Sequence, residues 1–129
     1  MDPFGFEDLK VYQKARQLVR DVYALFSFFP EEEKFALSSQ LRRAVVSITS
    51  NIAEGMGRFS TREQAHFIEV AYGSLMEVYS QLQVSLDLNY IPETAFYKLK
   101  NDIREIAMIL SKLYSIRKEY ISKDNKEQT

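Results

Sequence analysis

The stretch QLRRAVVSITSNIAEGMGRFSTR, residues 40–62, decides the fold of this 129-residue chain. It contains an apolar stripe at spacings of four, three and four, which is typical of an amphipathic helix that faces other helices: Leu41, Val45, Ile48 and Ile52. A polar stripe lies beside it, about 100° further round the helix: Gln40, Arg43, Ser47, Asn51 and Glu54. Half-buried polar side chains are costly unless they find partners, so this stripe predicts a fixed hydrogen-bond network.

Three further helices are expected around this one. The apolar spacing predicts a first helix over residues 6–28, ended by Pro30, and places Glu31–Glu33 at the start of the second, which runs to Gly55. A third helix is predicted over residues 61–89, and a fourth begins near Pro92. Because short connections favour antiparallel neighbours, we expect an all-α, antiparallel up-down-up-down four-helix bundle. Residues 1–121 should form this single domain, and residues 122–129 a polar, frayed tail.

The third helix carries polar residues that should face the polar stripe. Ser74 and Glu77 lie on the side nearest its core seam, and Gly73 would allow close approach of another backbone. We therefore predict one structural polar network across the interface of the second and third helices: Arg43, Ser47, Asn51, Glu54, Ser74 and Glu77. Within it, Arg43 is expected to pair with the carboxylate of Glu77 or of Glu54. The alternative interpretation of the stripe is a binding site.

The turn between these two helices contains glycines and a capping signal. Gly55-Met56-Gly57 predicts a helix end with a glycine in the left-handed conformation. Ser60 with Glu63 has the spacing of a capping box at the start of the next helix. The segment lacks the preceding strand and the GK[ST] sequence of a phosphate-binding loop.

Composition argues against most catalytic chemistry. The chain has no cysteine, which excludes disulfides, thiolate nucleophiles and cysteine-based zinc sites. Its single histidine, His66, follows Glu63 at the Glu-x-x-His spacing of di-iron bundles, but such a site needs two of these motifs. A nucleophile and base arrangement lacks a second histidine as well. We therefore expect no enzymatic activity, no metal and no cofactor.

Charge and hydropathy bear on location and partners. No run of about 18 apolar residues is present, and the N-terminus MDPFGFEDLK is acidic where a secretory signal would be basic, so we expect a cytoplasmic protein with no membrane partner. The net charge of −1 and pI near 5.9 leave only local basic patches for nucleic acid. The third helix has a second apolar face, and the segment 23–29 is rich in aromatic residues. This is more apolar surface than a lone bundle should expose, so it predicts self-association.

The quoted stretch also resembles the signature of a bacterial family of small four-helix-bundle proteins encoded in intervening sequences of large-subunit ribosomal RNA genes. The matching elements are RRA, S, NIAEG and GSLxE, at Arg42, Arg43, Ala44, Ser47, Asn51, Ile52, Ala53, Glu54, Gly55, Gly73, Ser74, Leu75 and Glu77. The resemblance extends to the N-terminal residues Phe6, Leu9, Val11 and Tyr12, and to FP at Phe29 and Pro30. Tyr12 stands where the family often has tryptophan, a mild departure.

The resemblance implies an assembly and two classes of function. Members of the family, like the similar accessory proteins of diversity-generating retroelements, look like ring-shaped homopentamers. One implied function is a nucleic-acid-binding or nucleoprotein accessory module, which would bind RNA or DNA through Arg42, Arg58 and Arg62, projecting from one end of the second and third helices. The alternative is a structural scaffold that docks a partner protein and has no nucleic-acid role. Convergence of surface cations on one face would favour the first class.

Overall fold

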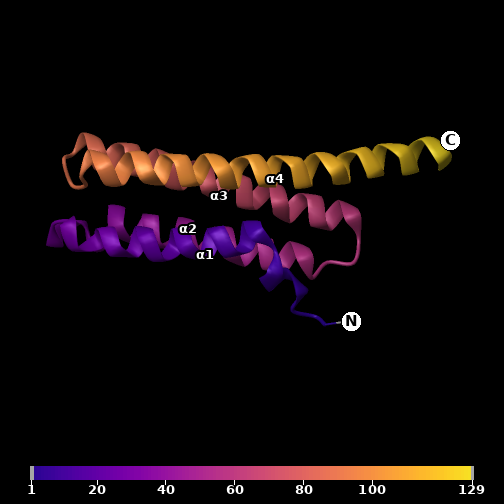
Figure 1. Cartoon of the computed structure of the whole chain (residues 1–129), viewed down its shortest axis with the longest axis horizontal. Helices are drawn as coiled ribbons and strands as arrows, with labels where there is room; N and C mark the ends of the chain where they lie inside the picture. The colour runs from indigo at the N-terminus through magenta and orange to yellow at the C-terminus, as the bar shows by residue number, and fades with distance from the viewer. Residues whose placement is uncertain (1, 129) are drawn as a thin grey trace.

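The computed structural model describes residues 2–128, and the regular elements among them are all helices, with no strand. Its four α-helices are α1 (Lys10–Leu25), α2 (Leu37–Met56), α3 (Thr61–Asp87) and α4 (Glu93–Gln128). Successive helices run in opposite directions along the long axis (Figure 1). The predicted all-α fold of four helices is therefore confirmed, while residues 1 and 129, at the ends of the predicted domain and tail, lie outside the described residues. Within residues 2–128, no helix is both long enough and apolar enough to cross a membrane.

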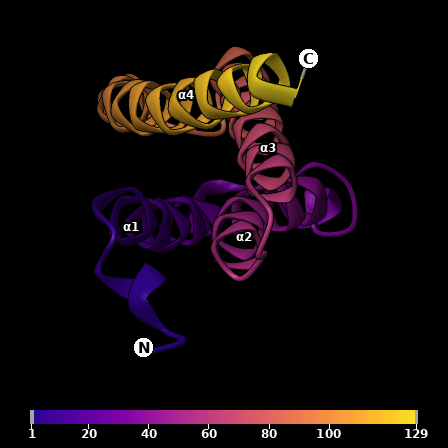
Figure 2. The same ribbon diagram turned by 90° about the vertical axis from the view of Figure 1, so that its right-hand side faces the viewer.

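The core follows the apolar spacing of the sequence. All four residues of the apolar stripe on α2 are at most 1% exposed: Leu41, Val45, Ile48 and Ile52. They pack with buried residues of the other three helices, such as Leu18, Leu75 and Ile106. Burial of each leucine or isoleucine contributes about 1.5–3 kcal/mol. α2 packs most extensively on α3, and α3 on α4, so α3 lies between its two neighbours when the bundle is viewed end-on (Figure 2).

The first two helices begin later than the sequence predicts. The predicted first helix is preceded by a separate 3-10 turn, Gly5–Asp8, because Leu9 between them has extended backbone. Glu31–Glu33 likewise form their own 3-10 turn after Pro30 instead of the first turn of α2. Ala36, at φ −119° and ψ −104°, separates that turn from α2.

The C-terminal segment differs from the predicted frayed tail. α4 continues as a helix through Gln128 and projects past the turn between α2 and α3 (Figure 1). Contacts with α3 explain why the helix continues. Ile121 is only 8% exposed, and the Arg62 guanidinium donates a hydrogen bond to Asn125 Oδ1 at 3.0 Å.

The glycines act differently from their predicted roles. Gly57 ends α2 at φ −87°, and no described glycine has a positive φ; the left-handed residue is Asn89, at φ 62°, which follows α3. A Cβ on Gly55 would lie 2.9 Å from Cβ of Phe67, so Gly55 allows the close approach of α2 and α3. A Cβ on Gly73 would meet nothing within 4 Å, so the close approach predicted there is absent.

The predicted start of α3 is correct. Ser60 is the N-cap residue, and its Oγ accepts a hydrogen bond from the backbone N–H of Glu63 at 3.1 Å. Such a cap contributes about 1 kcal/mol, because it satisfies one of the backbone donors that a helix start leaves unpaired.

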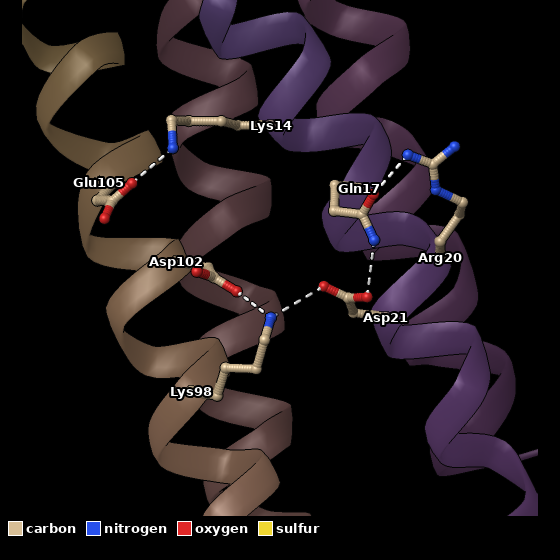
Figure 3. Close-up of polar contacts among 7 residues, drawn as sticks. All are labelled: Lys14, Gln17, Arg20, Asp21, Lys98, Asp102 and Glu105. Atoms are coloured by element: carbon tan, nitrogen blue, oxygen red, sulfur yellow. Dashed lines mark hydrogen bonds and ion pairs between the residues drawn. The ribbon is translucent and has the colours of Figure 1, made fainter.

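Ion pairs hold α1 against α4 (Figure 3). Lys14 Nζ lies 2.6 Å from Glu105 Oε2, while Lys98 Nζ lies 2.9 Å from Asp102 and 3.3 Å from Asp21. The hydrogen bond from Lys14 lowers the pKa of Glu105, and the hydrogen bond to Asp102 is the main reason that the pKa of Lys98 is raised. Exposed pairs of this kind contribute about 0–1 kcal/mol each, so they chiefly fix how the two helices align.

Candidate functional site

A shallow hollow of about 510 Å³ lies on the outer surface of α2, between the end of α1 and the seam with α3. One lining residue comes from α1 and the others come from α2; they are Tyr23, Arg42, Arg43, Val46, Ser47, Ser50, Asn51 and Glu54. Most of these side chains are polar. The hollow therefore contains much of the polar stripe that the sequence displays beside the core.

A pair of hydroxyl groups joins α2 to α3 along one edge of the hollow, and an amide of α2 bonds to one of them. Ser47 Oγ and Ser74 Oγ lie 2.6 Å apart, and Asn51 Nδ2 donates to the carbonyl oxygen of Ser47 at 2.7 Å and to its Oγ at 3.1 Å. The structure thus brings together three of the six residues of the predicted network. Each such hydrogen bond contributes about 0.5–1.5 kcal/mol, and these three residues are all half-buried.

The other three residues of the predicted network do not join it. Arg43 is exposed, and no carboxylate of residues 2–128 pairs with it, so the predicted ion pair with Glu77 or Glu54 is wrong. Glu54 instead lies 2.6 Å from Arg58, four residues further along the chain and just past the end of α2, and Glu77 accepts a hydrogen bond from Gln81 at 3.2 Å. Both partners are four residues away along the chain, so neither interaction crosses the seam; for Glu77 and Gln81 this is the usual pairing one turn apart on a helix.

Arg42 lies at the wall of the hollow, held by an aromatic pair. Its guanidinium carbon is 4.4 Å from the centroid of the Phe26 ring, and the Phe26 ring packs edge-on against Tyr23 at 5.4 Å. A cation over an aromatic face is attracted to the ring but keeps its charge. No carboxylate within the described range pairs with Arg42, so its charge is available at the hollow.

Arg58 and Arg62, the other predicted nucleic-acid contacts, lie elsewhere. Arg58 pairs with Glu54 and lies 4.7 Å over the Phe67 ring, whereas Arg62 bonds to the amide oxygen of Asn125. Both are at the turn between α2 and α3. Arg42 is about 21 Å from the end of α2, at about 1.5 Å per residue, so the three arginines do not project from one end of the bundle as predicted.

The hollow therefore gathers a different set of cations and donors from the one predicted. Arg42 and Arg43 are consecutive residues of α2 that line the hollow and form no ion pair within residues 2–128, and Ser50 adds a hydroxyl. Arginine, serine and asparagine side chains are among the groups that contact phosphate oxygens in nucleic-acid complexes. Arg43 was predicted to belong to the structural network, and neither Tyr23 nor Ser50 was predicted to line a site. The spacing of Arg43, Ser47 and Ser50 at i, i+4 and i+7 could have indicated a shared helix face.

A second, smaller hollow lies between α3 and α4. It measures about 210 Å³ and is mainly apolar, lined by Ile68, Glu69, Tyr72, Leu110, Ser111 and Tyr114. The hydrogen bond between Glu69 and the Tyr114 hydroxyl raises the pKa of Tyr114. These two polar groups are thus engaged with each other. In residues 2–128, no three histidine, aspartate or glutamate side chains are grouped so that they could hold a metal ion.

Apolar side chains also remain exposed on α4. The side of α4 that carries Glu105 toward α1 continues, at helical spacing, through an apolar stripe consisting of Ile109, Leu113, Ile116 and Tyr120. Because α1 begins at Lys10, one turn before Lys14, it cannot cover the later part of this stripe. Ile116 is 53% exposed and Tyr120 is 62% exposed.

Comparison with known proteins is consistent with this fold. The model of a family described as "23S rRNA-intervening sequence protein" matches residues 7–112. A crystal structure from Bacteroides thetaiotaomicron VPI-5482, described as a protein with unknown function from the S23 ribosomal protein family, is similar with a TM-score of 0.74 and 24% identity. The match covers 81% of this chain and 97% of that chain, and at this identity it shows the fold alone. No curated protein matches the sequence.

Proposed function

The chain belongs to the 23S rRNA-intervening sequence protein family, and on that premise we propose that it is a non-enzymatic, self-assembling bundle that binds nucleic acid as an accessory module. The observation that carries this proposal is the hollow on α2, where the consecutive residues Arg42 and Arg43 have no carboxylate partner among residues 2–128. The family description names a ribosomal RNA sequence, which is consistent with a nucleic-acid ligand but does not identify one.

The near-neutral charge of the whole chain limits nucleic-acid contacts to local groups of cations. With a net charge of −1, the surface offers no general attraction for phosphates, so binding depends on the few cations that are free of acidic partners. Glu54 is the acidic residue lining the hollow, and Arg58 pairs with it. Two phosphate contacts per chain would give a weak interaction, which symmetric repetition in an oligomer would multiply.

The proposal is tested by comparing two double variants that remove the same charge. Fluorescence anisotropy would follow labelled structured RNA and duplex DNA at about 50 and 200 mM salt. Arg42→Ala/Arg43→Ala should weaken binding by roughly tenfold or more, at about 1.4 kcal/mol per factor of ten. The control Arg62→Ala/Arg104→Ala keeps the Glu54–Arg58 pair at the hollow and should change binding by less than about threefold; Arg104 lies on α4 and bonds to Asn101. Circular dichroism would verify that both variants keep their helices.

Two results would overturn the proposal. The wild-type protein could fail to bind either nucleic acid at low salt, or both double variants could lose the same affinity. The second result would show that binding reports total charge and not the hollow, because each variant removes two positive charges.

A scaffold that docks a partner protein is the second candidate function, and the exposed apolar stripe of α4 favours it. Ile116 and Tyr120 would contribute to an interface with another chain if they were covered. Light scattering on a sizing column would compare the assembly with the 15.1 kDa mass of one chain and with the pentamer that the family resemblance implies. A stable oligomer whose mass is indifferent to RNA and DNA would favour the scaffold, and a monomer would refute self-assembly.

A further inference from the structure

We infer that the hollow on α2 takes an unpaired nucleotide of a single-stranded segment, with its base against Tyr23 and its phosphate at Arg43. This inference rests on the proposed nucleic-acid function and specifies its ligand. It follows from the size of the hollow, the fixed aromatic wall on one side and the free cation on the other.

The size of the hollow suits one nucleotide. The hollow is shallow and open, with a volume of about 510 Å³, so a strand could lay one base on its wall without entering an enclosed pocket. In an intact duplex the bases are stacked inside the helix, and a protein contacts their edges with an element that enters a groove. The hollow is a depression in the protein surface, so it presents no such element. Proteins that recognise single strands instead receive splayed bases, which they stack on aromatic side chains or on guanidinium planes.

The wall near α1 provides such a stacking surface. Tyr23 is 44% exposed, and its ring is held edge-on to Phe26 with 64° between the ring planes. The Arg42 guanidinium packs on Phe26 in turn, at 4.4 Å from the ring centroid. These three side chains therefore support one another before a ligand arrives, so binding a base would order few additional groups.

The other side of the hollow supplies the phosphate contact. Arg43 is exposed, and its guanidinium makes no ion pair within residues 2–128. Ser50 lies on the same helix face, two turns further along, whereas the hydroxyl of Ser47 is already bonded to Ser74 and Asn51. Arg43 and Ser50 are thus the groups with free donors, and Tyr23 lines the same hollow.

The test compares single-stranded and duplex RNA of the same sequence. Fluorescence anisotropy would measure a labelled 12-nucleotide strand alone and annealed to its complement. Three variants are needed: Tyr23→Ala removes the ring, Tyr23→Phe keeps it, and Tyr97→Ala is the matched control. Tyr97 is a 54% exposed tyrosine on α4 that also packs against a phenylalanine, Phe96. Adenosine monophosphate would serve as a competitor, to separate a free nucleotide from a strand.

The wild-type protein should bind the single strand at least tenfold more tightly than the duplex. Tyr23→Ala should lose roughly 5- to 100-fold for the single strand, the range expected for one stacked base, while Tyr23→Phe and Tyr97→Ala stay within about threefold of wild type. Equal affinity for duplex and single strand, or equal loss in Tyr23→Ala and Tyr97→Ala, would overturn the inference. So would competition by adenosine monophosphate at concentrations matching the affinity of the strand.

These results separate the two proposals. If the wild-type protein binds neither RNA, the proposed function itself fails. If it binds both forms equally and Arg42→Ala/Arg43→Ala abolishes that binding, the nucleic-acid function stands and the single-stranded ligand is wrong.

Discussion

Two identical glycine-to-alanine substitutions should have opposite effects on stability. Gly55→Ala would place a Cβ 2.9 Å from Cβ of Phe67 and 3.5 Å from the carbonyl oxygen of Gln64, so α2 and α3 would have to move apart. Gly73→Ala, on the exposed side of α3, would place its Cβ where nothing lies within 4 Å. The chemical change is the same, and both positions lie within helices.

The expected magnitudes follow from two opposing effects. Alanine in place of glycine inside a helix gains about 0.5–1 kcal/mol at either position. Overpacking at Gly55 costs about 1–3 kcal/mol, so Gly55→Ala should lower the free energy of unfolding by up to about 2.5 kcal/mol. Gly73→Ala should raise it by about 0.5–1 kcal/mol. The difference between the variants, about 1–3 kcal/mol, isolates the cost of the close contact.

Urea unfolding, followed by circular dichroism at one protein concentration, would give the free energy of unfolding of both variants and the wild type. If Gly55→Ala proved as stable as Gly73→Ala, the argument that α2 and α3 approach closely at Gly55 would be refuted. A loss of stability in Gly73→Ala would contradict the other half of the argument, because it would show that this position is not open.

Two further predictions concern contacts between helices. Ser47→Ala and Ser74→Ala should each lower the free energy of unfolding by about 0.5–1.5 kcal/mol. In a double-mutant cycle, the double variant should lose less stability than the two single variants added together, and strict additivity would show that the hydroxyls do not interact. The pKa of Glu105 lies below its usual value near 4.5 in the folded protein because Lys14 bonds to it, so the stability it contributes is present above that value and is lost as pH falls through the lower folded pKa. Glu105→Gln should therefore reduce the stability that the protein loses as pH falls below about 4.5, measured by urea unfolding at each pH. Glu119→Gln, on the outer surface of α4, is the control, and an unchanged pH profile in Glu105→Gln would contradict this role.

Local patterns in the sequence predicted the elements whose causes are local. The spacing of Leu41 and Ile48 placed the core face of α2, and both residues are fully buried. Ser60 and Glu63 marked the start of α3 correctly, because a cap depends on residues only three positions apart. Local patterns did not indicate that α4 continues as a helix past Ser122, because its contacts there are with α3, far away in the sequence.

The candidate site was predictable only in part. The polar stripe indicated that Ser47 would find a partner across the seam, and its Oγ lies 2.6 Å from Ser74 Oγ. Asn51 instead donates to Ser47 within α2. Helical spacing could not decide whether Arg43 reaches Glu77, because a guanidinium on a long side chain has several partners within reach. In the structure Arg43 is exposed and lines the hollow instead of belonging to the network.

By itself, the sequence determined that this protein is a bundle of four helices with an apolar core, because periodicity along one helix is fixed by its own 3.6-residue turn. It also determined that polar groups would line the seam of the second and third helices. Only the tertiary structure decided that α2 and α3 approach closely at Gly55 and not at Gly73. It also decided that Tyr23 of α1 lines the same hollow as Arg42 and Arg43 of α2. Those outcomes depend on how far apart the packed helices lie and how each is rotated about its axis, which no spacing within a single helix specifies.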